Sequence, residues 1–426
     1  MGTSSAHERL VQQVAGAVVD GGDPAAAAEA AGFNTAVTHR PAVVVAATDA
    51  ADVAAAVRYA NDEALAVTVQ ATGHGAVEPA DGTVLVSTKR MQGVRVDPVA
   101  RVARVEAGVG WRSVIDAAVP HGLAPLSGSS SGVGVVGYTL GGGMGHLARR
   151  HGFAADHVRS LDLVTREGEV RTVTGANDPE LFREIRGGQD RFGIVTALEF
   201  DLFPVPRFFG GAMIFTGPAV GDVLHSFAAW AETLPEEVTT SVALLRLPPV
   251  DDVPPPLRGV VSLALRFGFT GTPERGEALL APMRRVATPV LDSIGPMSFA
   301  AVDGIHMDPT DPMPAVTRGG LLHGMPADLV DTLLAVAGPG VDVPLAVVEL
   351  RLMGGALARP AAVPNAVTGR EGAFSLVAIA PAPPPLVDAA HAVTSGVVDA
   401  LRPWSTGTML ANFAGHAAAD LAAGAR

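Results

Sequence analysis

The sequence predicts an α+β protein of two domains, with a boundary near residue 205. Three observations lead to this prediction. The 426 residues are enough for two domains that each bury a core. Before the boundary, short apolar segments and helical patterns form βαβ-like units around a glycine-rich stretch at 127–152. After it, strand patterns alternate with helix patterns, which favours an antiparallel or mixed sheet covered by helices on one face.

The elements of the first domain are predicted to be short. Residues 6–32 have the pattern of one or two amphipathic helices. An apolar strand at 42–46 precedes a helix at 50–61, which Thr48 and Asp49 are suited to cap. The remaining predicted elements are strands at 67–70, 84–87, 94–97, 101–106 and 193–203, a hairpin at 160–174, and helices at 111–121 and 178–185.

The second domain, 206–404, is predicted to hold longer elements. Its expected strands lie at 211–215, 241–247, 260–270, 345–352 and 372–379. Its expected helices lie at 221–234, 272–286, 326–337 and 385–401.

Composition excludes several classes of protein. A net charge of −13 argues against a non-specific binder of nucleic acid or of anionic membranes. The absence of cysteine excludes disulfides, thiolate metal sites and a cysteine nucleophile, and we predict no metal site. No run of about 18 uncharged apolar residues is present, and the N-terminus has no secretory signal pattern. We therefore expect a cytoplasmic enzyme with a small-molecule substrate, and we keep a homodimer open.

The stretch at 127–152 reads SGSSSGVGVVGYTLGGGMGHLARRHG, and a short partner upstream, at 70–78, reads QATGHGAVE. Glycine lets the backbone approach a ligand closely, and successive exposed N–H groups form a concave binding site for anions. This composition suits a phosphate-bearing cofactor. A buried glycine-rich turn is the alternative, and the glycines alone do not separate the two.

Four segments resemble the berberine-bridge-enzyme-like FAD-linked oxidases of the vanillyl-alcohol-oxidase or PCMH-type superfamily. They are VQATGHG at 69–75, VGVVGYTLGGGMG at 133–145, DPELFREIRGGQDRFGIV at 178–195, and weaker matches at 348–356 and 412–413. The resemblance implies a PCMH-type, two-subdomain FAD-binding domain at 1–205, completed by 405–426. The family pattern runs on past Phe413 for longer than this chain does, so we expect a difference in how that domain closes.

The resemblance also implies which residues bind FAD. The family's matching histidine is bonded covalently to the flavin, which assigns that role to His74, although an isolated loop histidine is more often only hydrogen bonded. Ser130 falls where many relatives have a second attachment through cysteine, and because serine cannot form it, one linkage is expected. The implied FAD-binding residues are Thr72, Gly73, His74, Gly75, Ser130, Gly134, Val135, Gly137, Tyr138, Thr139, Gly142, Gly143, Gly145, Gly193, Ile194, Val195 and Asn412. For Tyr138, packing is the favoured role.

The substrate side is predicted from strand periodicity. Alternation places Glu349 and Arg351 on the face opposite Val348 and Leu350. A carboxylate beside a guanidinium suits substrate polarisation or proton abstraction, and a solvated ion pair is the alternative. By the same logic Arg246, Ser262 and Arg266 are candidates for this face.

Relatives often use a tyrosine as the base, but residues 410–412 here read Leu-Ala-Asn. The candidate catalytic residues are therefore Glu349, Arg351 and His323. The resemblance implies an FAD-dependent oxidase that transfers hydride from a hydrophobic secondary metabolite to flavin N5 and is reoxidised by O2. A flavin-fold protein for small-molecule binding or resistance, a non-redox cyclase and a dehydrogenase that does not use O2 are the alternatives.

Overall fold

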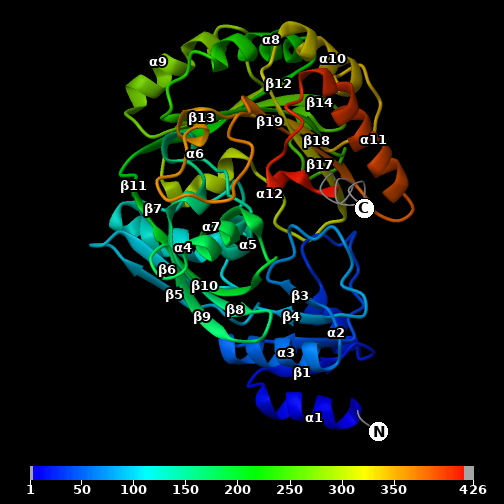
Figure 1. Ribbon diagram of the computed structural model, residues 1–426. Helices are drawn as coiled ribbons and strands as arrows, with labels where there is room; N and C mark the ends of the chain where they lie inside the picture. The colour runs from blue at the N-terminus through cyan, green and yellow to red at the C-terminus, as the bar shows by residue number, and fades with distance from the viewer. Residues whose placement is uncertain (1–2, 417–426) are drawn as a thin grey trace.

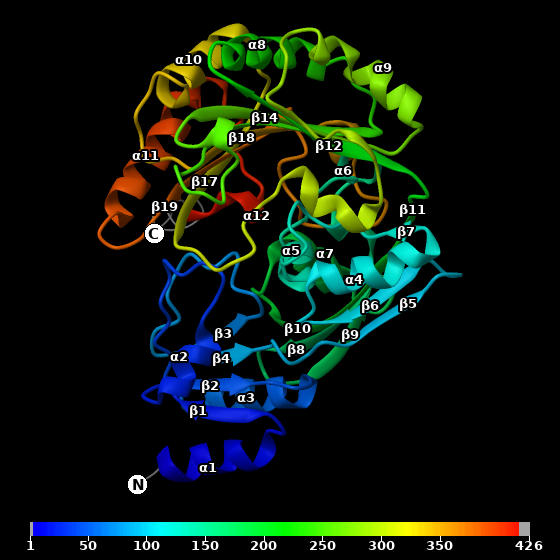
Figure 2. The same cartoon turned by 180° about the vertical axis from the view of Figure 1, so that it is seen from behind.

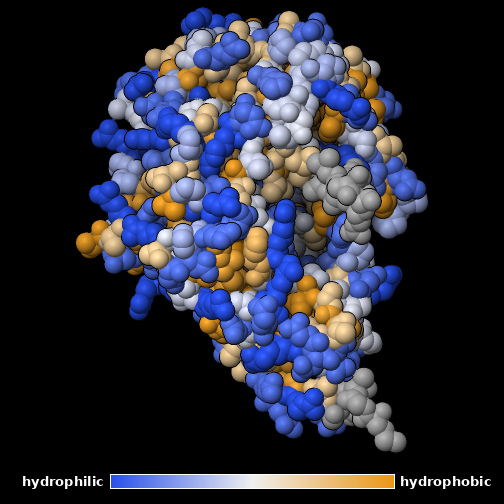
Figure 3. Space-filling model, in the orientation of Figure 1, coloured by the Kyte–Doolittle hydropathy of each residue, from blue (hydrophilic) through white to orange (hydrophobic). Residues whose placement is uncertain are grey.

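The computed structural model describes residues 3–416 and contains three main sheets stacked from the N-terminal end to a large helix-covered sheet (Figure 1). The predicted α+β class, with an antiparallel sheet under helices on one face, is confirmed. Within the described residues, every helix is too short or too polar to cross a membrane. The surface in Figure 3 is mostly hydrophilic, with hydrophobic residues scattered across it.

The N-terminal sheet has the order β1-β2-β4-β3, in which β1 is antiparallel and the other three strands are parallel. Its strands are β1 (Ala17–Asp20), β2 (Val43–Ala46), β3 (Val67–Gln70) and β4 (Val84–Ser87). Helix α3 (Ala50–Asp62) begins as predicted at Asp49, whose carboxylate accepts hydrogen bonds from the N–H groups of Ala51 and Asp52.

The prediction of helix alone over 6–32 was wrong. Helices α1 (Thr3–Gln13) and α2 (Pro24–Ala30) flank strand β1. A side chain at Gly16 would place its Cβ 2.0 Å from the carbonyl oxygen of Ala46, so glycine lets the chain lie against β2. This strand depends on a partner that is distant in sequence, which local periodicity does not reveal.

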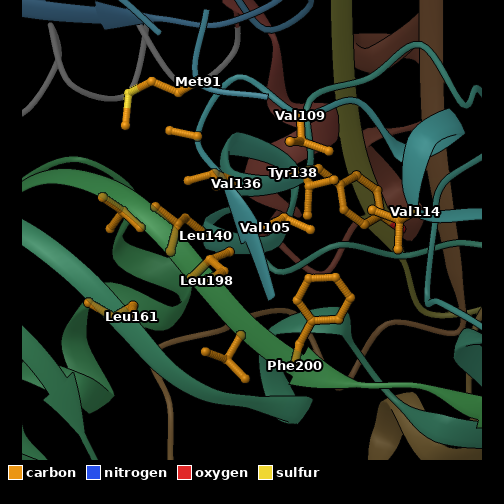
Figure 4. Close-up of a cluster of buried hydrophobic side chains, with 14 of the residues drawn as sticks. Met91, Val105, Val109, Val114, Val136, Tyr138, Leu140, Leu161, Leu198 and Phe200 are labelled. Carbon is orange, nitrogen blue, oxygen red and sulfur yellow. The ribbon is translucent and has the colours of Figure 1, made fainter. Parts of the chain in front are cut away.

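The middle sheet is antiparallel, with the order β5-β6-β10-β8-β9. Its strands are β5 (Val94–Asp97), β6 (Val102–Glu106), β8 (Val158–Thr165), β9 (Val170–Thr174) and β10 (Gly193–Asp201). Beside it lie α4 (Trp111–Ala118), α5 (Val135–Leu140) and α7 (Pro179–Gly188), and a two-stranded ribbon joins β7 (Leu123–Ala124) to β11 (Phe203–Pro204). The apolar side chains of this region form one core, which holds Tyr138 among Val105, Val114 and Phe200 (Figure 4).

The large sheet is antiparallel, with the order β15-β12-β14-β13-β18-β19-β17, and β16 pairs with β12. Its strands are β12 (Phe208–Thr216), β13 (Val238–Arg246), β14 (Val261–Phe269), β15 (Leu291–Asp292), β16 (Gly295–Met297), β17 (Ala315–Leu322), β18 (Val347–Leu352) and β19 (Phe374–Pro381). Strand β17 was missed by the sequence prediction, because its sequence AVTRGGLL contains two glycines and little alternation.

Helices cover the face of the large sheet that is turned away from the middle sheet (Figures 1 and 2). They are α8 (Ala219–Ala231), α9 (Pro273–Arg284), α10 (Ala327–Ala337) and α11 (Val387–Ala400), close to the predicted ranges. Val348, Leu350 and Leu352 belong to the apolar core under these helices. The opposite face therefore looks toward the first domain.

Two arginines, the buried Arg149 and the partly buried Arg370, connect the two halves of the chain. Arg149, in α6 (Ala148–His151), donates hydrogen bonds to the carbonyl oxygens of Met353, Val238, Pro235 and Leu234. Arg370 reaches in the other direction and pairs with Asp156 at 2.6 Å. The predicted boundary near residue 205 falls between β11 and β12 and stays a prediction.

Candidate active site

The loop after β3 holds His74 in a fixed position. Gly73 has φ +72°, and a side chain there would place its Cβ 2.5 Å from the Cα of Gly32, so glycine is required. The His74 ring stacks on Phe33 at a centroid distance of 3.9 Å. Its Nδ1 lies 2.9 Å from the hydroxyl oxygen of Thr72. The other ring nitrogen, Nε2, is not bonded to Thr72.

The ring of His74 is uncharged near neutral pH. Burial lowers the pKa of His74 to about 4. A neutral imidazole retains a lone pair on one ring nitrogen, which is the form that attacks an electrophilic carbon. The local structure is therefore compatible with a covalent bond from this residue.

The start of the glycine-rich stretch lies against this loop. An ideal Cβ on Gly132 would be 3.7 Å from the hydroxyl oxygen of Ser130 and 4.0 Å from Cε1 of His74. An ideal Cβ on Gly134 would be 3.5 Å from the hydroxyl oxygen of Thr72. The structure thus brings together Thr72, His74, Ser130 and Gly134, which are separated in the sequence.

Glycines further along have two different roles. A Cβ on Gly137 would meet no atom within 4 Å, so the backbone is open there. Gly142 and Gly143 have φ of +108° and +77°, and a Cβ on Gly145 would be 1.8 Å from the carbonyl oxygen of Ser127. These three glycines are needed to fold the loop, so the packing role and the cofactor role proposed for them coexist.

Several polar atoms at the loop have no partner among the described residues. They include the buried hydroxyl oxygens of Ser127 and Thr139. A buried polar atom without a hydrogen bond costs about 1–3 kcal/mol, so such atoms mark a place where a ligand can bond. Together with the open backbone at Gly137 and the neutral His74, they fit a ligand with many acceptor oxygens, as FAD has.

Tyr138 and Val135 turn their side chains into the core rather than onto the loop surface. Tyr138 packs edge-to-face on Trp111 at a centroid distance of 5.4 Å, and burial raises the pKa of Tyr138. Val135 is fully buried in the same core. Val135 therefore offers only its backbone to a cofactor, whereas the buried hydroxyl of Tyr138 has no hydrogen-bond partner among the described residues.

The C-terminal helix and β10 supply the last predicted cofactor residues. Asn412, in α12 (Ala411–Ala414), donates a hydrogen bond of 2.8 Å to the carbonyl oxygen of Tyr138 and so joins the glycine-rich loop. Gly193 has φ +139° at the start of β10, and Ile194 and Val195 are buried in the core. Only the backbone of β10 is available for a contact with FAD, and that contact stays a prediction.

The large sheet presents a polar row toward this loop. Strand register aligns Arg266, Ser241, Arg351 and Ser375 side by side on β14, β13, β18 and β19. Glu349 lies beside this row and is 3% exposed, so the alternative of a solvated ion pair is wrong. The predicted division of β18 into two faces is confirmed.

Glu349 is held by several donors. Its Oε1 accepts hydrogen bonds from Arg266 Nη1 at 2.7 Å and from Ser241 Oγ at 2.6 Å. Its Oε2 accepts one from Arg351 Nε at 2.8 Å. Burial raises the pKa of Glu349, but Arg351 and Arg266 outweigh that effect and hold it well below the usual range. A carboxylate in this state is a weak proton acceptor at neutral pH.

Two buried histidines in the site were not predicted from the sequence. The rings of His146 and His306 are 5.0 Å apart, and His306 Nε2 lies 3.3 Å from Glu349 Oε1 without hydrogen-bonding geometry. Burial lowers the pKa of both histidines, and the nearby arginines lower it further. His146 directly follows the glycine-rich motif, and that position was a signal that could have found it. His306 has no such signal.

Three other candidates do not line the cavity. His323 is exposed after β17 and does not line the cavity, so its predicted catalytic role stays a prediction without support from this site. Arg246 donates to the carbonyl oxygens of Ala337, Gly338 and Val341 at the helix side, and so does not join the polar row. Ser262 is buried without a hydrogen-bond partner among the described residues and lies outside the cavity lining.

The two sides of the site meet at Arg351. Its Nη2 lies 3.5 Å from the hydroxyl oxygen of Ser129, and its guanidinium lies 4.9 Å from the centroid of Phe413. Among residues 3–416 no cluster of His, Asp or Glu has the arrangement of a metal site. The site therefore combines a glycine-rich loop with open backbone on one side and a charged sheet face on the other.

Comparisons with known proteins agree with this description. Residues 41–174 match the family described as FAD binding domain. The (R)-6-hydroxynicotine oxidase of Paenarthrobacter nicotinovorans is 29% identical over 271 residues, which is 63% of this chain and 58% of that protein. The FAD-dependent monooxygenase FUP4 of Fusarium proliferatum is 33% identical over 208 residues, which is 48% of this chain and 40% of that protein. The chain thus spans about half the length of these curated relatives.

Solved structures support the fold over nearly the whole chain. The 6-hydroxy-D-nicotine oxidase of Arthrobacter nicotinovorans superimposes with a TM-score of 0.80 at 23% identity, covering 94% of this chain and 89% of that one. A variant of the berberine-bridge-enzyme-like 1 protein of Physcomitrella patens gives 0.83 at 18% identity, covering 96% and 90%. The fold is therefore the one found in berberine-bridge-enzyme-like proteins, and residues 41–174 match an FAD binding domain, in agreement with the motifs in the sequence.

Proposed function

We propose that this protein is an FAD-dependent oxidase that removes hydride from a small molecule, at a C–H bond beside a hydroxyl or amine, with O2 as the final acceptor. One observation carries the proposal. Arg351, on the large sheet, reaches to 3.5 Å from Ser129 at the glycine-rich loop. The polar row and the His74 loop therefore enclose one site from two sides, where a substrate would lie against a cofactor.

The described residues fit FAD, and when bound it would supply the hydride acceptor. The open backbone at Gly137 and the unpartnered hydroxyls of Ser127 and Thr139 suit its phosphate and ribityl oxygens. His74 would hold the isoalloxazine edge through one covalent bond. Ser130 provides no thiol, so a second linkage has no residue to form it.

The charged row would orient the substrate. Arg351 and Arg266 are fixed by Glu349, and their guanidinium groups would bind the substrate oxygen and favour loss of its O–H proton to the base, so that hydride loss from the adjacent carbon gives a carbonyl. Glu349 remains the predicted base, although its lowered pKa favours a positioning role. The apolar groups around the site, such as Met144, Ile305 and Leu352, support a hydrophobic secondary metabolite as the substrate.

Two measurements test the proposal. Purified protein should show the absorbance bands of flavin, and acid precipitation should leave the colour in the pellet if His74 is bonded to it. Peroxide should then form when a substrate is supplied. A colourless protein that takes up no added FAD would overturn the proposal.

A small-molecule binding or resistance protein is the second candidate. Two observations favour it: Glu349 is hydrogen bonded to Arg266 and Arg351, and the substrate domain contains no tyrosine. Under this alternative, ligands would bind and shift the flavin spectrum, but flavin would stay oxidised when O2 is removed. Bleaching of the flavin by a bound substrate without O2 would decide for the oxidase.

A further inference from the structure

A cavity between the glycine-rich loop and the large sheet is lined by cationic but not by acidic side chains. Arg149 from the first domain and Arg266 and Arg351 from the second contribute to its wall, and no Asp or Glu among the described residues lines it directly. This arrangement is unusual in a chain whose net charge is −13. The cavity therefore has a local charge opposite to that of the whole protein.

One carboxylate, that of Glu349, is bonded to this wall and compensates part of its charge. Glu349 pairs with both Arg266 and Arg351, so this trio keeps one net positive charge. Arg149 donates to carbonyl oxygens and has no ion pair among residues 3–416, which adds a second positive charge. Because these groups are buried, water and salt screen them little, and the field in the cavity favours an anion.

Hydrogen-bonding atoms without partners also face this region. Nε2 of His146 and Nε of Arg266 have no hydrogen-bond partner among the described residues. Both residues are only 4% exposed. The Arg266 Nε–H is a donor, and a neutral His146 supplies one donor nitrogen in a suitable tautomer. An oxyanion of a ligand would satisfy both of these groups.

We infer that the substrate of this site carries one anionic group, a carboxylate or an acidic enol or phenol, on a compact apolar body. The anionic oxygen would lie between Arg266 and Arg351 with His146 beside it, and Phe267 and Ile305 would contact the apolar body. Cationic amines of the same size would be excluded, because the cavity already has a positive charge. This inference names the substrate class and rests on the proposed function of the same site.

Three probes of similar size test the charge preference. Benzoate, benzamide and benzylamine differ in charge but hardly in size, and calorimetric titration into the FAD-loaded protein measures the affinity of each. We expect benzoate to bind at least about ten-fold more tightly than benzamide, with benzylamine weakest. Equal affinities, or the reverse order, would overturn the inference. So would benzoate binding that FAD abolishes, because the flavin would then occupy the cavity.

A matched pair of variants tests whether Arg351 causes the preference for benzoate. Arg351→Gln removes one guanidinium from the cavity, and Arg359→Gln removes an exposed one that pairs with Glu236. Benzoate affinity should fall at least about ten-fold in the first and stay unchanged in the second, while benzamide affinity changes little in either. A preference that survives Arg351→Gln would contradict the assignment. Circular dichroism confirms that each variant is folded.

The proposed function and this inference fail in different ways. Flavin absorbance and peroxide production are recorded on the same preparation as the titrations. Bound flavin and peroxide without a preference for benzoate would overturn the substrate class alone. A preference for benzoate in protein that holds no flavin would overturn the oxidase and leave the anion site in place.

Discussion

Arg266 Nη1 lies 2.7 Å from Glu349 Oε1, and both side chains are almost fully buried. The pair joins β14 to β18 across the intervening strand β13, whose Ser241 bonds to the same carboxylate oxygen. Arg351 completes the group from β18 itself. The folded state therefore contains one buried carboxylate held by two guanidinium groups, and its loss has consequences for stability, for pH dependence and for activity.

Glu349→Ala should be strongly destabilising, because it leaves two guanidinium groups near one another without a counterion. Removing one partner of a buried ion pair typically costs about 3–5 kcal/mol of the free energy of unfolding. Glu349→Gln keeps an acceptor for Ser241 and should cost less. Urea denaturation measures both, and a loss below about 1 kcal/mol for Glu349→Ala would contradict the described network. Equal peroxide rates for Glu349→Gln and the wild type would remove Glu349 from the chemistry.

The same carboxylate makes stability depend on acid pH. The pKa of Glu349 in the folded protein lies well below the value of 4.5 for a free glutamate. Its contribution is therefore fully present above about pH 5 and is lost as the pH falls below the unfolded-state pKa toward the folded-state pKa. Wild type should lose more stability than Glu349→Gln between pH 5 and pH 3, as measured by thermal unfolding in matched buffers. Parallel curves for the two proteins would show that Glu349 is not held in this way.

How much of the site around Glu349 can be predicted from the sequence depends on how far apart in the sequence the contacting residues lie. Alternation along β18 was enough to place Glu349 and Arg351 on one face, because a strand has a strict period of two. The partners Arg266 and Ser241 are set by the register between strands, and Ser241 was not predicted at all. His306 enters through a short helix, Phe299–Ile305, whose position depends on packing against distant strands. Local sequence patterns contain no information of that kind.

The glycine motifs were more informative, because glycine is required where the backbone has a positive φ or a close neighbour. At Gly73 and Gly143 the positive φ values and the close neighbours explain why glycine stands there. The motif alone did not separate a cofactor loop from a packed turn, and the structure shows tightly packed glycines and an open backbone position in one segment. His323 was predicted from its residue type alone, in a stretch where β17 was also missed, and the structure leaves it exposed and outside the cavity lining.

Attachment of FAD to His74 should depend on Thr72 and be insensitive to pH near neutrality. Since the pKa of His74 is about 4, the ring stays neutral and nucleophilic from pH 8 down to about pH 5.5. Thr72→Val removes the hydroxyl 2.9 Å from Nδ1 and should slow attachment to added FAD. Flavin retained in acid-precipitated pellets, followed over time, measures the rate. His74→Ala should retain none, and flavin in its pellet would place the bond at another residue.

Arg149→Met should loosen the junction of the two domains. The side chain supplies donors to four carbonyl oxygens of the second domain, and those in the buried interface would be left without partners. Each unsatisfied buried carbonyl costs about 1–3 kcal/mol, so a loss of several kcal/mol is expected. The neighbour Arg150 is exposed and bonds to Thr270, and Arg150→Met should change stability by no more than about 1 kcal/mol. Similar losses for the two variants would refute the fastening role of Arg149.

Gly137→Ala separates cofactor binding from folding. No atom lies within 4 Å of a Cβ at this position, and the residue is inside helix α5, so the folded chain accepts a methyl group. Replacing glycine by alanine in a helix stabilises it by roughly 0.5–1 kcal/mol. If the open backbone here lies against FAD, the methyl group should instead weaken FAD binding.

Gly396 provides the control for this change. It lies inside helix α11 of the second domain, and a Cβ there also meets no atom within 4 Å. Gly396→Ala should show the same small gain in stability with unchanged FAD content. Both variants are measured by thermal unfolding of FAD-free protein and by titration with FAD. An FAD affinity for Gly137→Ala equal to that of Gly396→Ala would show that the cofactor does not approach the chain at residue 137. The open space beside this helix would then be ordinary protein surface, and the cofactor-binding role would rest on the other residues of the loop.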